Sequence, residues 1–351
     1  MITQMSVTDH PEFDKHEQVV LCRDEQSGLQ AIIAVHNTNL GPAACGCRMW
    51  PYNSVDEALT DALRLSKAMS YKNAMAGLPL GGGKSVIIGN PRTDKSETLL
   101  EAFGNCVQQL GGSYYVAEDV GICVEDIEVV SRRTGYVFGI ADGAGDPSPV
   151  TAQGCFNALK ATIHFKYGDD SLAGIRVAVQ GVGHVGYHFC KLLHEAGAEL
   201  VVADINEAAV VRVVDEFGAK AVDPRKIFAQ DVDVFAPCAL GGILNDDTIP
   251  QLKAGIICGA ANNQLLRAEH GYQLHREGIL YLPDYVVNAG GMLGVAGDIL
   301  ADYTAASVQK RVSGLYNTVL DILSLANQDE QPPFEIADKL ARGRIMRMQL
   351  I

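Results

Sequence analysis

The chain lacks long apolar runs and is poor in basic side chains. No stretch approaches the ~18 consecutive apolar residues that span a bilayer, and the first segment, MITQMSVTDHPEFDKHEQ, is polar. The 28 Lys and Arg are outnumbered by 42 Asp and Glu, which gives a net charge of −14. This balance disfavours a nucleic-acid surface and binding to anionic membranes. We therefore expect a cytoplasmic protein without nucleic acid or membrane partners.

The chain also lacks the cysteine spacings typical of metal sites and disulfide scaffolds. Its nine cysteines form no Cys-x-x-Cys pair, and no spacing of His and Cys fits a zinc site. Cys45 and Cys47 are the closest two in the sequence. A chain of this length does not need disulfides to fold, so we expect free thiols and no metal.

The composition that is present indicates a protein of two globular domains. The 351 residues are 48% hydrophobic and 20% charged, which supplies material for two cores. A loop rich in Gly, Asp, Pro and Ser at residues 141–149 separates the two halves. We predict an α/β fold with one domain over residues 1–148 and a second over residues 149–329.

Apolar periodicity predicts the main elements of the first half. They are a hairpin within residues 17–36, a glycine-bearing loop at 41–48, a helix that Ser54 caps and that runs toward Lys72, a helix around 99–110, and a strand at 114–117. In the second half, Thr151 is expected to cap a helix that ends at Tyr167.

Residues 68–88, AMSYKNAMAGLPLGGGKSVII, concentrate candidate chemistry around two lysines. Lys72 closes a helical pattern, and Lys84 follows three glycines and precedes a buried strand at 85–88. Desolvation and a neighbouring cation both lower the pKa of an ammonium group, so Lys84 is a candidate general base near neutral pH. The alternative for Lys84 is a solvated surface lysine. A phosphate-binding loop is excluded, because Leu78 stands where its first glycine should be.

Asp119 is a further candidate for acid–base chemistry. It follows the predicted strand at 114–117, and the carboxyl ends of strands are well placed for catalysis. The alternative is a carboxylate that only caps a loop.

The second half carries a dinucleotide-binding pattern in its full context. A strand at 175–180 precedes Gly181, Gly183 and Gly186, a helix follows, and the next strand at 199–203 ends in Asp204. The glycines allow a tight turn, approach of a pyrophosphate and close helix packing, and the helix N-terminus faces the phosphates. Asp204 suits a ribose and repels a 2′-phosphate, so NAD is favoured over NADP. The alternative is a purely structural glycine turn.

Later strands at 232–235 and 255–259 are expected to continue this parallel sheet. Unusual loops follow them at 237–242 and 260–264, where ligands of open α/β sheets collect. Residues 284–291 open a helix rich in small residues, and the remainder reads as two helices broken at residues 331–333.

Taken together, the chain resembles the amino-acid dehydrogenases of the glutamate/leucine/phenylalanine/valine superfamily, most closely the leucine dehydrogenase branch. The resemblance covers roughly residues 16–345 and rests on blocks that are specific in combination: AIIAVHNTNLGPA, RMW, ALTDALRLS, SYKNAMAGLPLGGGKSVI, AEDVG, GDPSPVTAQG, VQGVGHVG, FAPCALGGILN, AGAANNQL and GILYLPDYVVNAGG.

The resemblance implies an activity and an organisation for the chain. The activity is reversible NAD-dependent oxidative deamination of an L-amino acid to the 2-oxo acid and ammonia. The first domain binds substrate and mediates assembly into a homo-oligomer, a dimer or an octamer, and the second binds the dinucleotide. The C-terminal helices, from about residue 330 to 351, return to the first domain, and closure over substrate expels water.

The resemblance also implies roles for individual residues. Lys72 binds the substrate carboxylate, Lys84 activates the water that attacks the imino intermediate, and Asp119 relays a proton to and from the substrate nitrogen. The implied substrate-binding positions are Lys72, Ala44, Gly46, Ala117, Asn262, Met292 and Val295. The implied cofactor-binding positions are Thr151, Gly181, Gly183, His184, Val185, Gly186, Asp204, Ile205, Cys238, Ala239, Ala260, Asn262 and Asn288.

Substrate preference depends on the side-chain pocket. Glutamate dehydrogenases hold the second carboxylate with a lysine and a serine, whereas this chain has Ala44 and Val295 at those positions, with Met292 nearby. A buried unpaired carboxylate costs several kcal/mol, so glutamate should be rejected. We favour leucine, then valine and isoleucine; Ala44 leaves more room than the usual leucine, so phenylalanine or tryptophan is the alternative.

Two departures from the family pattern keep a further alternative open. Cys45 replaces a glycine of the Gly-Pro-Ala-x-Gly-Gly pattern, and Ile122 and Cys123 stand where Thr-Thr is usual. Cys45 is expected to reshape the substrate pocket, or else to point into the core without effect. A catalytically weakened binding or regulatory relative is the second alternative, against which the retained Lys72, Lys84 and Asp119 argue.

Overall fold

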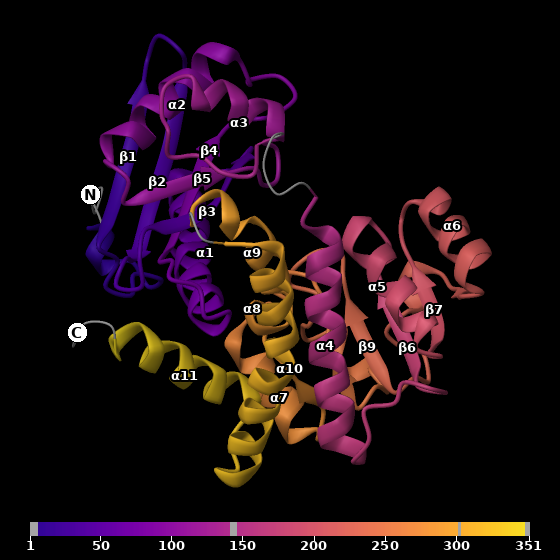
Figure 1. The fold of residues 1–351 in the computed structure, drawn as a ribbon. Helices are drawn as coiled ribbons and strands as arrows, with labels where there is room; N and C mark the ends of the chain where they lie inside the picture. The colour runs from indigo at the N-terminus through magenta and orange to yellow at the C-terminus, as the bar shows by residue number, and fades with distance from the viewer. Residues whose placement is uncertain (1–5, 141–145, 301–302, 348–351) are drawn as a thin grey trace. The chain divides into compact units, whose positions relative to one another are not determined.

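The computed structural model describes residues 6–140, 146–300 and 303–347, and Figure 1 shows the arrangement of the elements within each unit. The chain forms two compact units. The first comprises Met1–Gly145, Val295–Asp302 and Ala341–Ile351, and the second comprises Asp146–Gly294 and Tyr303–Leu340. Among the described residues, no helix combines the length and apolar character that a membrane crossing requires.

The first unit is a mixed sheet of five strands with helices on both faces. Its elements are β1 (Gln18–Asp24), β2 (Leu29–Asn37), β3 (Ala43–Trp50), α1 (Val55–Met75), β4 (Gly82–Ile88), α2 (Glu97–Gln109), β5 (Tyr114–Ala117) and α3 (Val124–Ser131). The strand order is β1-β2-β4-β3-β5; β2 pairs antiparallel with β1 and β4, and β3 pairs parallel with β4 and β5.

Strand β2 is apolar along its length because both of its faces are covered. Ile33 packs in a core with Phe103 of α2, whereas Ile32 packs in a second core with Leu63 of α1. Successive side chains of a strand point to opposite faces, so this alternation places α1 on one face of the sheet and α2 on the other.

The local start and turn signals of this unit are confirmed. Ser54 accepts a hydrogen bond from the backbone N–H of Glu57 at the start of α1. The hairpin of β1 and β2 turns at Gly28, whose φ of 76° favours glycine. The prediction of a loop at 41–48 is wrong: β3 occupies most of it, because parallel neighbours on both sides supply the hydrogen bonds that its small residues need.

The second unit contains a parallel sheet of six strands. Its elements are α4 (Ser148–Tyr167), β6 (Arg176–Gln180), α5 (His184–Glu195), β7 (Glu199–Ala203), α6 (Glu207–Phe217), β8 (Lys220–Ala221), β9 (Val234–Pro237), β10 (Ile256–Ile257), α7 (Ala268–Arg276), β11 (Leu280–Tyr281), α8 (Asp284–Val287), α9 (Gly290–Val295), α10 (Ala305–Gln328) and α11 (Pro333–Arg347). The last residue of α9 and the last turns of α11 belong to the first unit.

The order of this sheet is β11-β10-β9-β6-β7-β8, which is the doubly wound order of dinucleotide-binding domains. The chain leaves the sheet centre in opposite directions from β6 and β9, so the switch point lies between these strands. The predicted α/β class with a Rossmann second domain is therefore confirmed. Helix α4 begins at Ser148 and not after Thr151, because Pro147 stands at the N-cap and Thr151 Oγ1 donates to the Pro147 carbonyl, 2.9 Å away.

Candidate active site

The two lysines come from elements that are fastened together in the first unit. Asn73 Nδ2 donates to the Gly81 carbonyl over 2.6 Å, and a Cβ at Gly82 would lie 2.0 Å from the backbone nitrogen of Ser70. Close packing of α1 on β4 therefore requires glycine at 82. Lys72 lies in the last turn of α1, half-buried.

Lys84 lies within β4 and not ahead of a strand, which corrects the sequence-based prediction. It pairs with Ala34 of β2, and β4 already begins at Gly82, two residues before Lys84. The Lys84 side chain is 4% exposed. A lysine in the middle of a sheet cannot reach solvent freely, so its charge must be met by protein groups.

Asp119 supplies that charge. Lys84 Nζ donates a hydrogen bond to Asp119 Oδ2, which follows β5. Glycine is required at position 46 of β3, because a Cβ there would lie 2.1 Å from the Glu118 carbonyl oxygen and 2.8 Å from Asp119 Cβ. The structure thus brings Lys84, Asp119 and Gly46 together.

The ion pair reverses the predicted direction of the Lys84 pKa. Burial alone lowers the pKa of Lys84, but attraction by Asp119 outweighs it, so the pKa lies above its ordinary value. For Asp119, burial raises the pKa, and the opposing attraction of Lys84 and Arg48 holds it below its ordinary value. The prediction of a lowered Lys84 pKa is therefore wrong for this arrangement, because a paired ammonium group is favoured over a neutral amine.

Arg48 is a charged residue of the site that sequence reasoning missed. Its Nε lies 3.4 Å from Asp119 Oδ2, and its Nη1 donates to Asp61 Oδ2 over 2.9 Å. Tyr52 Oη donates to the same Asp61 oxygen over 2.6 Å. Arg48 belongs to the RMW block, but its partners Asp61 and Asp119 are distant in the sequence, so the block does not indicate them.

The thiol of Cys45 also faces the lysine. Lys84 Nζ donates to Cys45 Sγ over 3.7 Å, and the Cys45 residue is 8% exposed. Cys45 pairs with Val116 of β5 and has no positive φ, so the strand accepts a side chain here without backbone strain. All nine cysteines are free thiols.

The remaining predicted substrate positions are distributed over both units. Ala44 is fully buried on β3, and Ala117 ends β5 opposite Gly46. Val295 belongs to the first unit, whereas Met292, on α9, belongs to the second. Both of these are half-buried.

The glycine turn of the second unit has the geometry of a dinucleotide cradle. Gly181 has a φ of 94°, and a Cβ at Gly186 would lie 2.1 Å from the Gly181 carbonyl oxygen. A Cβ at Gly183 would meet nothing within 4 Å, so open space adjoins the start of α5. No side chain caps α5 at Gly183, which leaves its first N–H groups for an anion. His184 and Val185 form the first turn of this helix.

Asp204 fixes the edge of this cradle. Its Oδ2 accepts from the Val182 N–H and its Oδ1 from the Asn206 N–H, each over 2.8 Å. Each oxygen keeps a further lone pair for a ribose hydroxyl. Ile205 beside it is 93% exposed.

The loops after β9 and β10 adjoin the cradle on the other side of the switch point. A Cβ at Gly181 would lie 2.7 Å from the Ala239 side chain, which places the loop of Cys238 and Ala239 against the turn. Asn288 Nδ2 donates to Asn262 Oδ1 over 2.7 Å and to the Ala260 carbonyl over 3.0 Å. Asn288 Oδ1 is buried without a hydrogen-bond partner among the described residues, an acceptor that fits a carboxamide donor.

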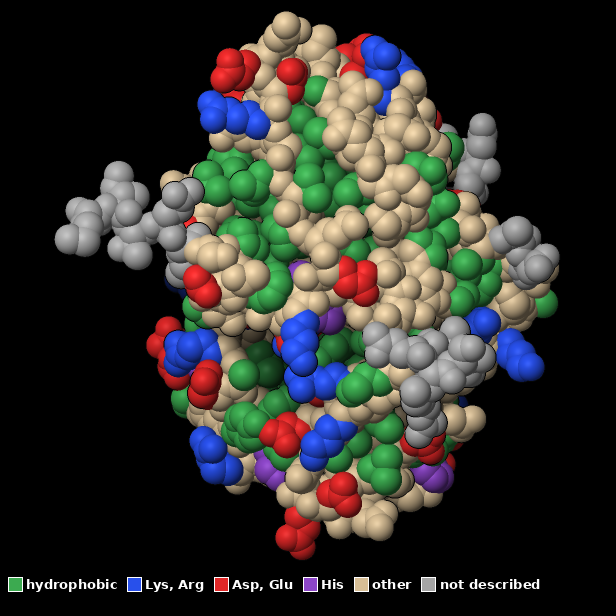
Figure 2. All heavy atoms as spheres, turned by 90° about the vertical axis from the view of Figure 1, so that its left-hand side faces the viewer, with side chains coloured by type: hydrophobic (Ala, Val, Ile, Leu, Met, Phe, Trp, Pro, Cys, Tyr) green, Lys and Arg blue, Asp and Glu red, His purple; other side chains and the backbone are tan. Residues whose placement is uncertain are grey.

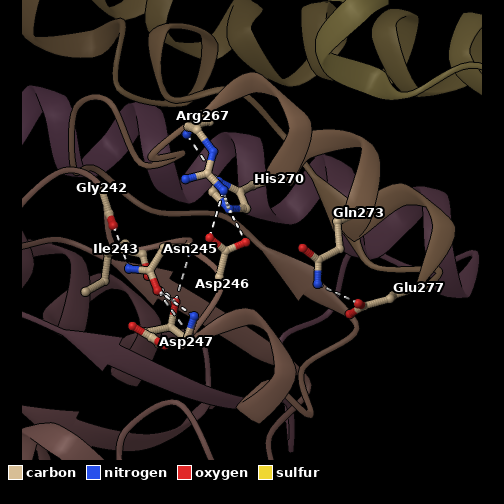
Figure 3. A network of polar contacts seen from close by, with 10 residues as sticks. Gly242, Ile243, Asn245, Asp246, Asp247, Arg267, His270, Gln273 and Glu277 are labelled. Atoms are coloured by element: carbon tan, nitrogen blue, oxygen red, sulfur yellow. Dashed lines mark hydrogen bonds and ion pairs between the residues drawn. The ribbon is translucent and has the colours of Figure 1, made fainter.

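A polar network that the sequence did not reveal joins the residues that follow these two loops (Figure 3). Arg267 Nη2 donates to Asp246 Oδ2 over 2.7 Å, and His270 Nε2 lies 3.2 Å from Asp246 Oδ1. The Gly242 N–H donates to the Asn263 carbonyl over 2.7 Å, which joins the two loops directly. Asn263 has a φ of 51°, and its N–H donates to Asp284 Oδ2 over 2.7 Å.

Thr151 lies against the start of α9. A Cβ at Gly291 would lie 2.7 Å from Thr151 Oγ1, and one at Gly290 would lie 2.3 Å from the Val150 carbonyl oxygen. The small residues of α9 therefore let it pack on α4. Within the described ranges, no three His, Cys, Asp or Glu side chains gather closely enough to hold a metal ion.

Comparison with known proteins identifies the family of both parts of the chain. Residues 16–141 match the model of the Glu/Leu/Phe/Val dehydrogenase dimerisation domain, and residues 201–319 match that of Glutamate/Leucine/Phenylalanine/Valine dehydrogenase. Leucine dehydrogenase of Bacillus subtilis (strain 168) is 53% identical over 337 residues, covering 95% of this chain and 92% of the relative. Phenylalanine dehydrogenase of Bacillus thermotolerans is 45% identical, covering 94% and 88%.

A solved structure gives the same result for the fold. The crystal structure of L-tryptophan dehydrogenase from Nostoc punctiforme superposes with a TM-score of 0.83 at 43% identity, covering 95% of this chain and 97% of the other. Together with the glycine cradle and the buried lysine, these matches show that the chain belongs to the Glu/Leu/Phe/Val dehydrogenase family and is an amino-acid dehydrogenase that uses a nicotinamide cofactor.

Proposed function

We propose that the chain catalyses the reversible NAD-dependent oxidative deamination of an apolar L-amino acid, with leucine preferred over valine and isoleucine. The observation that carries this proposal is the buried Lys84–Asp119 pair in a chain about 50% identical to leucine dehydrogenases over nearly its full length. Lys84 and Asp119 share a proton through their hydrogen bond, beside the position where Gly46 packs on the Glu118 backbone. Such a pair can supply the base and the acid that are needed to replace ammonia by water at one carbon.

In the proposed reaction, Lys72 binds the substrate carboxylate. Gly181, Gly183, Asp204 and Asn288 would hold the nicotinamide cofactor, which would supply an acceptor for the hydride of the substrate Cα. Lys84, as a neutral amine, takes a proton from the water that attacks the imino carbon, and Asp119 carries a proton to the departing nitrogen. Water addition and loss of ammonia then give the 2-oxo acid, and the reverse sequence is reductive amination.

Substrate choice is proposed to rest on the absence of charge at the side-chain positions. Ala44 is fully buried and Val295 and Met292 are apolar, so a substrate carboxylate there would lack a partner, at a cost of several kcal/mol. Asp204 is proposed to favour NAD, because its carboxylate repels a 2′-phosphate and the residues that follow it, Ile205 and Asn206, carry no positive charge.

A second candidate is a preference for phenylalanine or tryptophan. The small Ala44 favours it, and so does the similarity to the phenylalanine and tryptophan dehydrogenases above. One methylene changes specificity by only about 1–3 kcal/mol, so several apolar amino acids are expected to react.

The experiment is a panel of L-leucine, valine, isoleucine, phenylalanine, tryptophan and glutamate, each with NAD and with NADP, followed by absorbance of the reduced cofactor. We expect kcat/KM to be highest for leucine with NAD and undetectable for glutamate. The Lys84→Ala protein, purified in parallel, excludes a contaminating dehydrogenase. Highest kcat/KM for an aromatic amino acid selects the second candidate, and preference for glutamate contradicts both.

We further propose that the first unit assembles the chain into a homo-oligomer, a dimer or an octamer. Its family model is described as a dimerisation domain, and Leu21, Trp50 and Val120 of this unit expose 63%, 48% and 48% of their surface. On the face of the molecule in Figure 2, hydrophobic side chains lie among interspersed acidic and basic ones. Sedimentation equilibrium measures the mass, and a monomer contradicts the proposal.

A further inference from the structure

Asp119 lies between two cations that come from neighbouring parallel strands. Lys84 of β4 donates to its Oδ2, and Arg48 Nε of β3 lies 3.4 Å from the same oxygen. Within the described part of the chain, Arg48 Nε is buried and makes no hydrogen bond. Arg48 Nε thus lies at ion-pair distance from the Asp119 carboxylate, which accepts its side-chain hydrogen bond from Lys84 instead.

The guanidinium of Arg48 is fixed in that position from its other end. Its Nη1 donates to Asp61 Oδ2 over 2.9 Å, and Tyr52 Oη donates to the same oxygen over 2.6 Å. The Asp61 carboxylate therefore anchors the guanidinium at Nη1, while Nε lies 3.4 Å from Asp119 Oδ2. Arginine keeps its proton throughout the working pH range, so its charge is constant.

Charge balance shows what this arrangement does for a base. With Lys84 protonated, the charges of Lys84, Asp119, Arg48 and the Asp61 carboxylate paired with Arg48 sum to zero. When Lys84 gives its proton to solvent, Arg48 is the cation that remains beside Asp119. Without Arg48, the same proton loss leaves a largely buried carboxylate without a counter-charge, which is a costly state. The Asp119 side chain is 27% exposed, so water reaches the pair and can accept the proton.

We propose that Arg48 is a positioning residue for Asp119. When Lys84 gives up its hydrogen bond to Asp119, Arg48 Nε donates one in its place, and Lys84 can then become the neutral general base. The proposal rests on the proposed function of Lys84 and Asp119 and adds the group that makes their proton exchange feasible. A turn of the Asp119 side chain from Lys84 to Arg48 satisfies the one buried Arg48 nitrogen that has no hydrogen bond.

The other titratable groups around the pair do not supply this charge. They are Cys45 and Cys47 of β3, Tyr114 of β5, Asp61 of α1, and Tyr52. Burial raises the pKa of Cys47 to about 12 and raises that of Tyr114 well above its ordinary value, so both stay neutral. Asp61 is already paired with Arg48, and the Cys45 thiol carries no positive charge.

The sign of the effect is therefore fixed. Repulsion by Arg48 lowers the pKa of Lys84 against the larger opposite effect of Asp119, and attraction by Arg48 lowers the pKa of Asp119. Replacing Arg48 by a neutral side chain raises both, so the neutral amine of Lys84 forms only at higher pH. If the role of Arg48 were only structural, its replacement would lower activity by the same factor at every pH.

The test compares Arg48→Gln and Arg48→Lys with Arg64→Gln, a half-exposed arginine of α1 that pairs with Glu12. Two quantities are measured against pH: kcat/KM for oxidative deamination of leucine, and the rate of reductive methylation of Lys84 by formaldehyde and a hydride donor, followed by peptide mass spectrometry. The second requires no turnover. Thermal unfolding of each variant reports folding.

In Arg48→Gln we expect the midpoint of both profiles to move to higher pH by at least about one unit, a tenfold change in the proton equilibrium. Arg48→Lys keeps the charge but lacks the fixed Nε, so its midpoint should lie between those of the wild type and Arg48→Gln. If Arg48→Gln does not fold, Arg48→Lys provides the test in its place. Arg64→Gln should leave both unchanged. A methylation midpoint that stays at the wild-type pH in both Arg48 variants overturns the proposal, even if activity falls. Absence of deamination in the wild type instead overturns the proposed function, while the methylation profiles still decide the role of Arg48.

Discussion

At the scale of single residues, Lys84 shows how a partner sets the chemistry of a buried group. Its side chain is 4% exposed, which alone would lower the pKa, yet the Asp119 carboxylate raises it. As the proposed base, Lys84 is protonated at neutral pH, because the Asp119 carboxylate favours the ammonium form. Oxidative deamination should therefore accelerate as pH rises, since the neutral amine becomes more abundant.

Replacing Lys84 by alanine is expected to lower kcat by at least about 10²-fold, because the general base is lost. Binding of the reduced cofactor, measured by its fluorescence, should stay unchanged, since the glycine cradle lies in the other unit. Lys95→Ala, which removes a lysine of the first unit paired with Asp126, is the matched control. Near-normal turnover in Lys84→Ala contradicts the proposed mechanism.

Replacing Asp204 by alanine is expected to lower kcat/KM with NAD by about tenfold, since hydrogen bonds to a ribose are lost. The ratio of NADP to NAD activity should rise, because the carboxylate no longer repels a 2′-phosphate. Rates with both cofactors are compared with those of Asp215→Ala, an exposed carboxylate on α6. A wild-type enzyme that already prefers NADP would refute the role given to Asp204.

Cys45→Gly is expected to change kcat/KM among leucine, valine and phenylalanine. The thiol contacts Lys84 Nζ at 3.7 Å, so its removal alters both the space and the hydrogen bonding beside the base. The strand conformation argues against backbone strain as the cause. Kinetics with the three substrates decide between the two interpretations: equal values before and after leave Cys45 as a packing residue, whereas a gain on one substrate shows that it tunes the pocket.

At the scale of elements, the start of α5 contains one glycine that packing requires, Gly186, and one that adjoins open space, Gly183. A Cβ at 186 collides with the Gly181 backbone, whereas a Cβ at 183 meets nothing. Gly183→Ala should keep the wild-type melting temperature but weaken binding of the reduced cofactor by about tenfold or more, because the methyl group occupies the pyrophosphate's approach.

Gly186→Ala should instead lower the melting temperature, because the helix must move away from β6. The two variants serve as controls for each other, with cofactor fluorescence and thermal unfolding measured on both. Equal cofactor affinity in Gly183→Ala and the wild type contradicts the cradle assignment.

At the scale of the whole molecule, a buried histidine couples folding to pH. His36 of β2 is 8% exposed, its Nδ1 lies 2.7 Å from Ser70 Oγ of α1, and its ring contacts that of His16. Burial and repulsion by His16 lower the pKa of His36 to about 4. Arg342 of α11 donates to Tyr71 Oη next to this cluster, so the C-terminal helix is joined to the same region.

Below a pH of about 6.5, the unfolded chain binds a proton at His36 that the folded chain does not. The free energy of unfolding should therefore fall by about 3 kcal/mol between pH 6.5 and 4, and the loss should shrink in His36→Gln. Urea unfolding followed by fluorescence of Trp50, the sole tryptophan, reports on the first unit. His275→Gln, an exposed histidine of α7, should keep the full pH dependence; an unchanged dependence in His36→Gln excludes the assignment.

Local patterns were sufficient for most elements and for the geometry of the glycine turn. Ser54 accepts a hydrogen bond from Glu57, three residues on, and Gly181, Gly186 and Asp204 make their contacts within one strand–helix–strand unit. Their effects depend on spacing along the chain, so the sequence displays them directly.

The tertiary structure alone decided three features of the catalytic half. Residues 43–50 form a strand because β4 and β5 pair with them on both sides; Arg48 lies beside Asp119 because β3 and β5 are neighbours; and the pKa of Lys84 rises because Asp119 reaches it. Each depends on residues that are distant in the sequence and adjacent in the sheet. Hydrogen-bond pairing and charge interactions fall off with distance in space and not along the chain, which is why the sequence determined the candidate residues and the fold determined their partners.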